Sequence, residues 1–207
     1  MKQTQTLKQR VYNEVIDSIV RGQFKAGQIL TEQELVARYG VSKSPVREAL
    51  TVLSSEGILS NIPRYGYQVF SFTLEKVADI MEFRAVLEDY LLCRAAENIR
   101  PGDLDRLRQL LECQQTEDSV WEHWQSNEDF HLQLASLARN EYCCQQLERS
   151  MRLLKLAYAQ FYWSQWNSAD IPNDLKNHRS ILDGLERGDL EFARDCLKRD
   201  LADFCIG

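Results

Sequence analysis

The chain has 207 residues, of which 44% are hydrophobic and 27% are charged, as in globular proteins of one or two domains. No apolar run approaches the ~20 residues needed to cross a membrane, and the first residues lack the apolar core of a signal peptide. None of the six cysteines forms a C-x-x-C pair, so the sequence predicts a cytoplasmic protein with reduced thiols and no membrane contact.

Charge is divided unevenly along the chain. The formal net charge is −6, which by itself argues against a nucleic-acid partner. Residues 1–70, however, hold nine basic and six acidic residues and carry a net charge of +3, whereas residues 71–207 carry −9. The sequence therefore predicts two parts with separate tasks, and contact with a polyanion at the amino-terminal part alone.

Three helices are expected before residue 57. Apolar residues recur at helical spacing over residues 7–21. A capping box at residues 31–34 opens a short second helix, which Gly40 ends. A third helix enters through residues 42–50 and stops at Gly57. Its entry combines Pro45, which is tolerated in a first turn, with a serine that can cap the helix, either Ser42 or Ser44.

The third helix carries basic and small polar residues at its amino-terminal end. Lys43 and Arg47 project from that end, while Val46, Leu50 and Leu53 form an apolar stripe. The first turn of a recognition helix meets base edges and phosphates in the major groove, so this arrangement suits a DNA reader. A solvated basic helix start is the other interpretation of these residues taken alone.

Two short β-prone runs follow, at residues 58–62 and 67–70, around Pro63-Arg64-Tyr65-Gly66. They predict a hairpin with a basic residue at its tip. Three helices followed by a hairpin within 70 residues correspond to a winged helix-turn-helix, assigned to residues 1–70.

The run Pro45-Val46-Arg47-Glu48-Ala49-Leu50, followed by Leu53, Glu56-Gly57 and Gly66, resembles the DNA-binding domain of GntR-family bacterial transcription regulators. The resemblance covers roughly residues 7–70 and implies binding to double-stranded DNA at a palindromic operator. It places seven residues on DNA, in the helix entry and the wing: Ser42, Lys43, Ser44, Arg47, Arg64, Tyr65 and Gly66. Members usually carry Arg at the position of Lys43 and often at that of Thr51, so Arg47 is the only arginine left on this helix.

Beyond a short linker at residues 71–74, the pattern is helical throughout. Helices are expected at residues 73–98, from 103 onward, 119–138, 141–163, 175–187 and 190–205, with a polar loop at 164–173. Gly188 and Asp189 supply an end signal and an N-cap between the last two helices. Residues 75–207 are therefore expected to form an all-α antiparallel bundle that binds a ligand and dimerises. The predicted fold class is mainly α.

Two histidines of the bundle stand in suggestive positions. Asn127 and His131 lie one turn apart on one helical face, and His178 opens the penultimate helix. This spacing resembles the FCD effector domain of the FadR branch of the GntR family, in which many members bind a divalent metal. The resemblance places the ligands on Asn127, His131, His178 and Asp200, with Asp200 where members usually carry His. Such N and O donors suit Zn, Ni or Mn. The other interpretation makes both histidines hydrogen-bonding residues of a pocket without metal.

Arginines on two bundle helices are candidates for effector binding. Arg84 matches a position where the family commonly carries Arg, and an inward-facing guanidinium would hold a carboxylate bidentately. An ion pair with a neighbouring acidic residue is the other interpretation. Arg152 is a weaker candidate of the same kind.

The sequence thus predicts a homodimeric transcription regulator, not an enzyme, whose operator binding responds to a small metabolite, expected to be a carboxylate. The effect of the metabolite on DNA binding would be a coupling between two sites. The alternative function is a helical-bundle metalloenzyme with an accessory winged-helix domain, but no nucleophile–base pair or phosphate-binding glycine loop accompanies the metal ligands.

Overall fold

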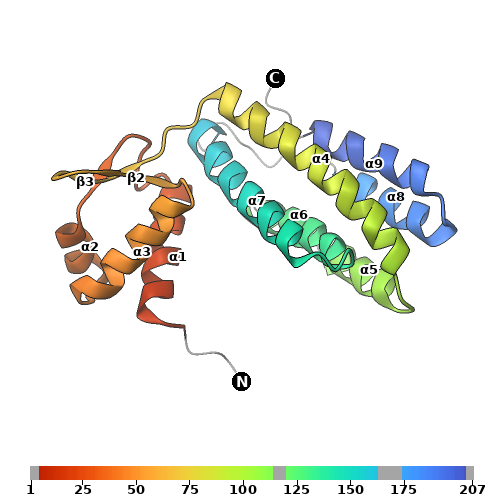
Figure 1. The fold of residues 1–207 in the computed structure, drawn as a ribbon, viewed down its shortest axis with the longest axis horizontal. Helices are drawn as coiled ribbons and strands as arrows, with labels where there is room; N and C mark the ends of the chain where they lie inside the picture. The colour runs from red at the N-terminus through yellow and green to blue at the C-terminus, as the bar shows by residue number, and fades with distance from the viewer. Residues whose placement is uncertain (1–4, 114–119, 163–173, 204–207) are drawn as a thin grey trace. The chain divides into compact units, whose positions relative to one another are not determined.

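The computed structural model describes residues 5–113, 120–162 and 174–203 (Figure 1). The chain divides into two compact units. The first contains the winged helix-turn-helix and the carboxyl-terminal part of one later helix, and the second contains the helical bundle. None of the described helices combines the length and the apolar character that crossing a bilayer requires.

The first unit has the predicted helices and hairpin. The helices are α1 (Leu7–Val20), α2 (Glu32–Tyr39) and α3 (Lys43–Ser55), and the hairpin pairs β2 (Leu59–Ile62) with β3 (Gly66–Val69). The sequence did not predict a third strand, β1 (Ile29–Leu30), which pairs antiparallel with β3 and gives the strand order β1-β3-β2. The winged helix-turn-helix is confirmed.

Helix capping in this unit agrees with the prediction at α2 and differs at α3. Thr31 and Glu34 form the expected capping box, and Gly40 ends the helix in the left-handed conformation. Ser42 occupies the N-cap position of α3 but makes no side-chain capping bond. The hydroxyl of Ser44 donates to the carboxylate of Glu48 instead, at 2.9 Å. The expected serine cap is therefore wrong, although the helix begins where it was predicted.

The wing depends on a glycine next to its tip, where β3 begins. A Cβ atom on Gly66 would lie 2.5 Å from the carbonyl oxygen of Leu30, and its φ of +132° lies in the region that favours glycine. The close approach of β1 to β3 therefore requires glycine here. Gly66 has a structural reason to be present that is independent of any contact with DNA.

The second unit is the predicted bundle of antiparallel helices (Figure 1). Its described helices are α4 (Leu74–Asn98), α5 (Asp103–Cys113), α6 (Val120–Ser136), α7 (Glu141–Tyr162), α8 (Asp174–Arg187) and α9 (Leu190–Asp203). The expected loop at 164–173 lies outside the described residues. Leucines from α4, α5, α8 and α9 pack with Phe130 of α6 into one buried core, which surrounds the polar site described below.

Helices α8 and α9 form a tight hairpin. Asp189 caps α9 as expected, because its carboxylate accepts the backbone N–H of Phe192 at 3.1 Å. Gly184 of α8 faces Ala193 of α9 so closely that an added Cβ would lie 3.0 Å from the alanine Cβ. The two helices approach each other at this glycine, and they carry two of the predicted metal ligands.

Candidate metal centre and nucleic-acid interface

Three predicted ligands from three helices meet inside the bundle. His131 of α6, His178 of α8 and Asp200 of α9 have exposed fractions of 1%, 0% and 0%. The Nε2 atom of His131 lies 3.0 Å from Oδ2 of Asp200, and Nε2 of His178 lies 3.3 Å from Oδ1. One donor atom from each residue falls within 4.8 Å of the others. The fold thus brings together side chains from α6, α8 and α9, although His131 and Asp200 lie about 70 residues apart in the sequence.

The donor atoms of this group are close together but poorly paired. Within the described residues, both Nε2 atoms and both Asp200 oxygens lack a partner in hydrogen-bond geometry. Buried polar atoms are nearly always satisfied, so a cluster of unsatisfied ones needs an explanation. Atoms that converge on a shared point without bonding to one another are what a cation site requires.

Glu88 of α4 completes the site and was not predicted from the sequence. Its carboxylate lies 2.5 Å from Nδ1 of His131 and also forms a buried ion pair with Arg84. A carboxylate on the second ring nitrogen is the usual way in which a ligating histidine is oriented. The i,i+4 spacing of Arg84 and Glu88 was available as a signal. The pairing of Glu88 with His131, 43 residues away, was not.

Burial and charge act against each other at this site. Burial by itself lowers the pKa of His131, but the carboxylates of Glu88 and Asp200 outweigh it and raise the pKa to about 9. Burial likewise raises the pKa of Asp200, yet His131 and His178 bring it well below its ordinary value. The pKa of Glu88 is also lowered, because Arg84 and His131 outweigh its burial.

The buried side chains of Arg84, Glu88, His131 and Asp200 carry one excess negative charge when His131 is neutral. Glu88 and Asp200 are two carboxylates, and Arg84 is the one permanent cation among these groups. A proton on His131 neutralises this charge and a divalent cation more than offsets it, and the two compete because a ligating imidazole is neutral. Two imidazoles and a carboxylate fit Zn, Ni or Mn. Asn127, buried one turn before His131, is positioned on the same face of α6.

The two predicted effector-binding arginines lie in different surroundings. Arg84 is 1% exposed and forms the ion pair with Glu88 that was the second interpretation of this residue. Its Nη2 atom has no hydrogen-bond partner among the described residues. Arg152 of α7 pairs with Glu148 one turn earlier, at 2.8 Å. Among the described residues, the cavity beside His131 and Glu88 has a volume of only about 10 Å³.

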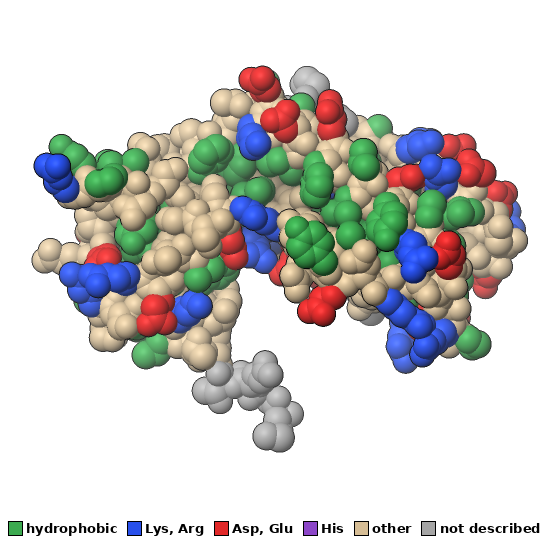
Figure 2. Space-filling model, in the orientation of Figure 1, with side chains coloured by type: hydrophobic (Ala, Val, Ile, Leu, Met, Phe, Trp, Pro, Cys, Tyr) green, Lys and Arg blue, Asp and Glu red, His purple; other side chains and the backbone are tan. Residues whose placement is uncertain are grey.

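The DNA-binding candidates lie on the surface of the first unit. Ser42, Lys43, Ser44 and Arg47 are all exposed at the start of α3. Arg64 and Tyr65 are exposed at the tip of the β2–β3 hairpin, where Tyr65 is 70% accessible and Arg64 adopts a positive φ of 71°. Figure 2 shows Lys and Arg side chains at the α2–α3 end of this unit and at the wing tip. Both groups match the electrostatic requirement of phosphate contact.

Two family models match the chain, one over its amino-terminal part and one over the helical bundle. The model described as "Bacterial regulatory proteins, gntR family" matches residues 7–69, and the FCD domain model matches residues 79–203. The chain belongs to the GntR family of transcriptional regulators with an FCD effector domain. The expected family and fold class are confirmed, and the regulator joins a DNA-binding unit to a helical effector domain.

Similar proteins share this description. The regulator is 28% identical to the transcriptional regulator McbR of Escherichia coli over 191 residues, which cover 91% of this chain and 86% of McbR. A solved structure of E. coli McbR/YncC superposes with a TM-score of 0.81 at 26% identity, covering 95% of this chain and 94% of that one. The gluconate operon repressor of Bacillus subtilis is 37% identical over 105 residues, 49% of this chain and 43% of the repressor. These relatives are regulators rather than enzymes, as predicted for this chain.

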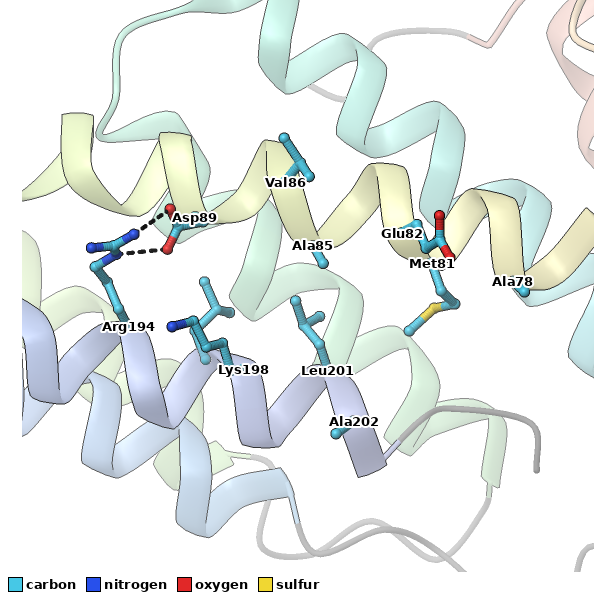
Figure 3. A pocket seen from close by; sticks show the side chains of 11 residues that line it. Ala78, Met81, Glu82, Ala85, Val86, Asp89, Arg194, Lys198, Leu201 and Ala202 are labelled. Atoms are coloured by element: carbon cyan, nitrogen blue, oxygen red, sulfur yellow. Dashed lines mark hydrogen bonds and ion pairs between the residues drawn. The ribbon is translucent and has the colours of Figure 1, made fainter.

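An apolar groove runs along the bundle between α4 and α9 (Figure 3). Its volume is about 610 Å³, and Met81, Ala85, Val86 and Leu201 line its centre. At one end, Arg194 binds both carboxylate oxygens of Asp89, at 2.7 and 2.9 Å. Val86 is 74% exposed, and Phe83 and Tyr90 of α4 are 49% and 45% exposed. Hydrophobic side chains gather along α4 and α9 on this face (Figure 2).

Removing one charge from the buried set has a predictable cost. Asp200→Asn keeps the shape of the side chain but leaves His131 without one of its two carboxylates, and breaking a buried charge pair typically costs about 3–5 kcal/mol. We expect a loss of about 3 kcal/mol in the free energy of unfolding of the metal-free protein, measured by urea denaturation with a chelator present.

Asp195→Asn is the matched control, because Asp195 lies on the same helix in an exposed pair with Lys198. Its expected cost is below about 0.5 kcal/mol. Equal stability of Asp200→Asn and Asp195→Asn would contradict the proposed buried charge balance.

Proposed function

We propose that the regulator is a homodimer that binds a palindromic operator, and that a small carboxylate, acting with a divalent metal in the FCD domain, modulates this binding. The observation that carries the proposal is the buried group of His131, His178 and Asp200 in a chain that also carries a DNA-binding unit. Each part of the proposal has its own support and its own test.

The DNA-reading role falls to the start of α3 and to the wing. Arg47 is 59% exposed and Lys43 67% exposed on the first turns of α3, which is the part of a recognition helix that enters the major groove. Ser42 and Ser44 would contact phosphates or bases beside them, and Arg64 and Tyr65 would reach the minor groove or phosphates from the wing.

Arg47→Ala tests this assignment. Arginine pairs bidentately with guanine, so its loss should weaken operator binding by roughly 1–3 kcal/mol. A gel-shift or fluorescence-anisotropy titration with a duplex selected from a random library measures the change. Arg106→Ala in α5, which removes an arginine 81% exposed on the second unit, is the control and should bind as the wild type does. Operator affinity unchanged by Arg47→Ala would refute the assignment.

A metal at the buried group is supported by its donor set. Two imidazoles and one carboxylate are held by three helices. Glu88 orients the imidazole of His131 by its contact with Nδ1. When bound, a divalent ion would more than offset the excess negative charge and supply a Lewis-acidic site for a ligand oxygen. Asp200 in place of an imidazole shifts the preference toward harder ions than a three-histidine site would have.

Isothermal titration of the chelator-treated protein with Zn²⁺, Ni²⁺ and Mn²⁺ tests the metal site. At least one ion should bind at one site per chain, and His178→Gln should weaken it by tenfold or more, as the loss of a ligand typically does. His123→Gln removes the histidine outside the group and should leave affinity unchanged. Equal effects of the two substitutions would exclude this site.

The carboxylate effector is supported by the unpaired donor of Arg84. Its Nη2 atom is buried without a hydrogen-bond partner among the described residues, close to the carboxylate of Glu88. An incoming carboxylate would satisfy that donor and, where a metal is bound, could share it. The cavity that the described residues form beside Glu88 and His131 is too small for such a ligand, so its entry would require the side chains or helices around it to move. One relative is named for the gluconate operon, and gluconate is a carboxylate.

A homodimer is supported by the exposed apolar face of α4. Contiguous exposed apolar surface commonly marks a protein–protein interface. We assign the groove between α4 and α9 to a second copy of the chain, because its charges suit a two-fold contact. Glu82 lies on one side of Val86 and Lys198 on the other, so an antiparallel contact centred on Val86 would bring Glu82 of one copy toward Lys198 of the other.

Val86→Asp tests the dimer surface. Val86 is 74% exposed, so the substitution leaves the core intact and places a charge in the proposed contact. We expect the wild type to sediment as a dimer at micromolar concentration and the variant to shift toward monomer by a factor of ten or more in Kd, since one buried unpaired charge costs several kcal/mol. Tyr142→Asp, at a residue 71% exposed on α7, should remain dimeric. A dimer of undiminished affinity in Val86→Asp would place the interface elsewhere.

A further inference from the structure

Glu32 connects the two basic side chains at the start of the recognition helix. It lies in the first turn of α2, fifteen positions before Arg47. Its Oε1 accepts the Nε hydrogen of Arg47 at 2.8 Å, and its Oε2 accepts from Nη2 at 3.1 Å. The Nζ atom of Lys43 lies 3.3 Å from the same Oε2. One carboxylate therefore contacts both cations of α3 that are assigned to DNA.

The contact with Arg47 fixes the plane of the guanidinium. An isolated exposed ion pair contributes little to stability, but a two-bond pair of guanidinium and carboxylate defines an orientation as well as an attraction. The Glu32 side chain is only 20% exposed, whereas Arg47 is 59% exposed. The partly buried carboxylate is thus the fixed member of the pair. Its pKa is lowered mainly by the hydrogen bonds from Arg47, so it is ionised at neutral pH.

The remaining donors of Arg47 are those needed to read a base. A guanidinium has five N–H donors, and Glu32 takes the Nε hydrogen and one Nη2 hydrogen. The edge formed by Nη1 and the other Nη2 hydrogen is left, and this edge can donate two parallel bonds to O6 and N7 of guanine. Lys43, held by a single longer contact, can exchange Glu32 for a phosphate.

We propose that Glu32 is a positioning residue that presents the outer edge of Arg47 to a guanine and so determines sequence selectivity. The proposal rests on the assignment of Arg47 as a base reader. Glu32 also has a cost, because a carboxylate next to the phosphate backbone repels every DNA sequence equally. Its loss should therefore raise non-specific affinity while it lowers discrimination. A residue with only a structural role cannot produce that opposite pair of effects.

Full-length wild type, Glu32→Gln and Glu34→Gln are compared on DNA selected by the wild type from a random duplex library. Binding is measured to the selected duplex, to duplexes in which each G·C pair is changed to A·T, and to an unrelated duplex. For Glu32→Gln we expect discrimination at one G·C pair to fall about tenfold, the scale of one bidentate base contact. Affinity for the unrelated duplex should rise about threefold at low salt, because one repulsive charge is gone.

Glu34→Gln is the matched control. It removes the same charge from the same helix, its carboxylate bonds to Thr31, and glutamine also supports a capping box. It should show the rise in non-specific affinity at most and no loss at the G·C pair. Thermal unfolding of each variant confirms that the protein is folded.

Three further results test the proposal. If Glu32→Gln keeps full discrimination, or weakens binding to all duplexes alike, the positioning role is refuted while DNA recognition stands. If the wild type selects no sequence from the library, the proposed function fails and this inference fails with it. In an Arg47→Lys background, the effect of Glu32→Gln on discrimination should disappear, because lysine lacks the planar guanidinium that Glu32 would orient. A persistent effect would also overturn the proposal.

Discussion

A chain of buried charges connects the helices of the effector domain, and the metal and effector sites proposed here depend on it. Arg84, Glu88, His131 and Asp200 follow one another in contact from α4 through α6 to α9, and His178 of α8 closes the series. Charges buried at this depth are tolerated only when each has a partner. The set is one positive charge short, so its state depends on a proton or a metal ion. The same charged residues therefore affect both the packing of the helices and the chemistry of the site.

The regulator uses the pairing of arginine and glutamate twice, with different consequences. Arg84 and Glu88 are both almost fully buried, so their pair acts as a fixed part of the core that orients His131. Arg47 and Glu32 lie at the surface, where water reaches the guanidinium and where the proposed DNA contact would compete for it. The same two functional groups thus serve as a rigid support in one unit and as an exchangeable contact in the other, because burial sets how readily the pair is broken.

What the sequence could predict depended on how local the signal was. Thr31, Gly40 and Asp189 end or begin helices through bonds to near neighbours, and each lies where its residue type indicated. Strand β1 is only two residues long and is defined by its pairing with β3, so no hydrophobic periodicity in the sequence predicted it. Glu88 and Glu32 were missed for a related reason. Their partners His131 and Arg47 lie 43 and fifteen positions away, on other helices, and only the fold brings them together.

The contact between Gly184 and Ala193 has a dynamic consequence. Two helices that meet with only the methyl group of Ala193 between them cannot slide or separate without losing that contact, so we expect α8 and α9 to move as one body. His178 and Asp200 belong to that body, whereas His131 and Glu88 belong to α6 and α4. Any opening that admits a ligand must then occur between the hairpin and the rest of the bundle. The 3.0 Å contact between Nε2 of His131 and Oδ2 of Asp200 spans that boundary and would be the first to report the motion.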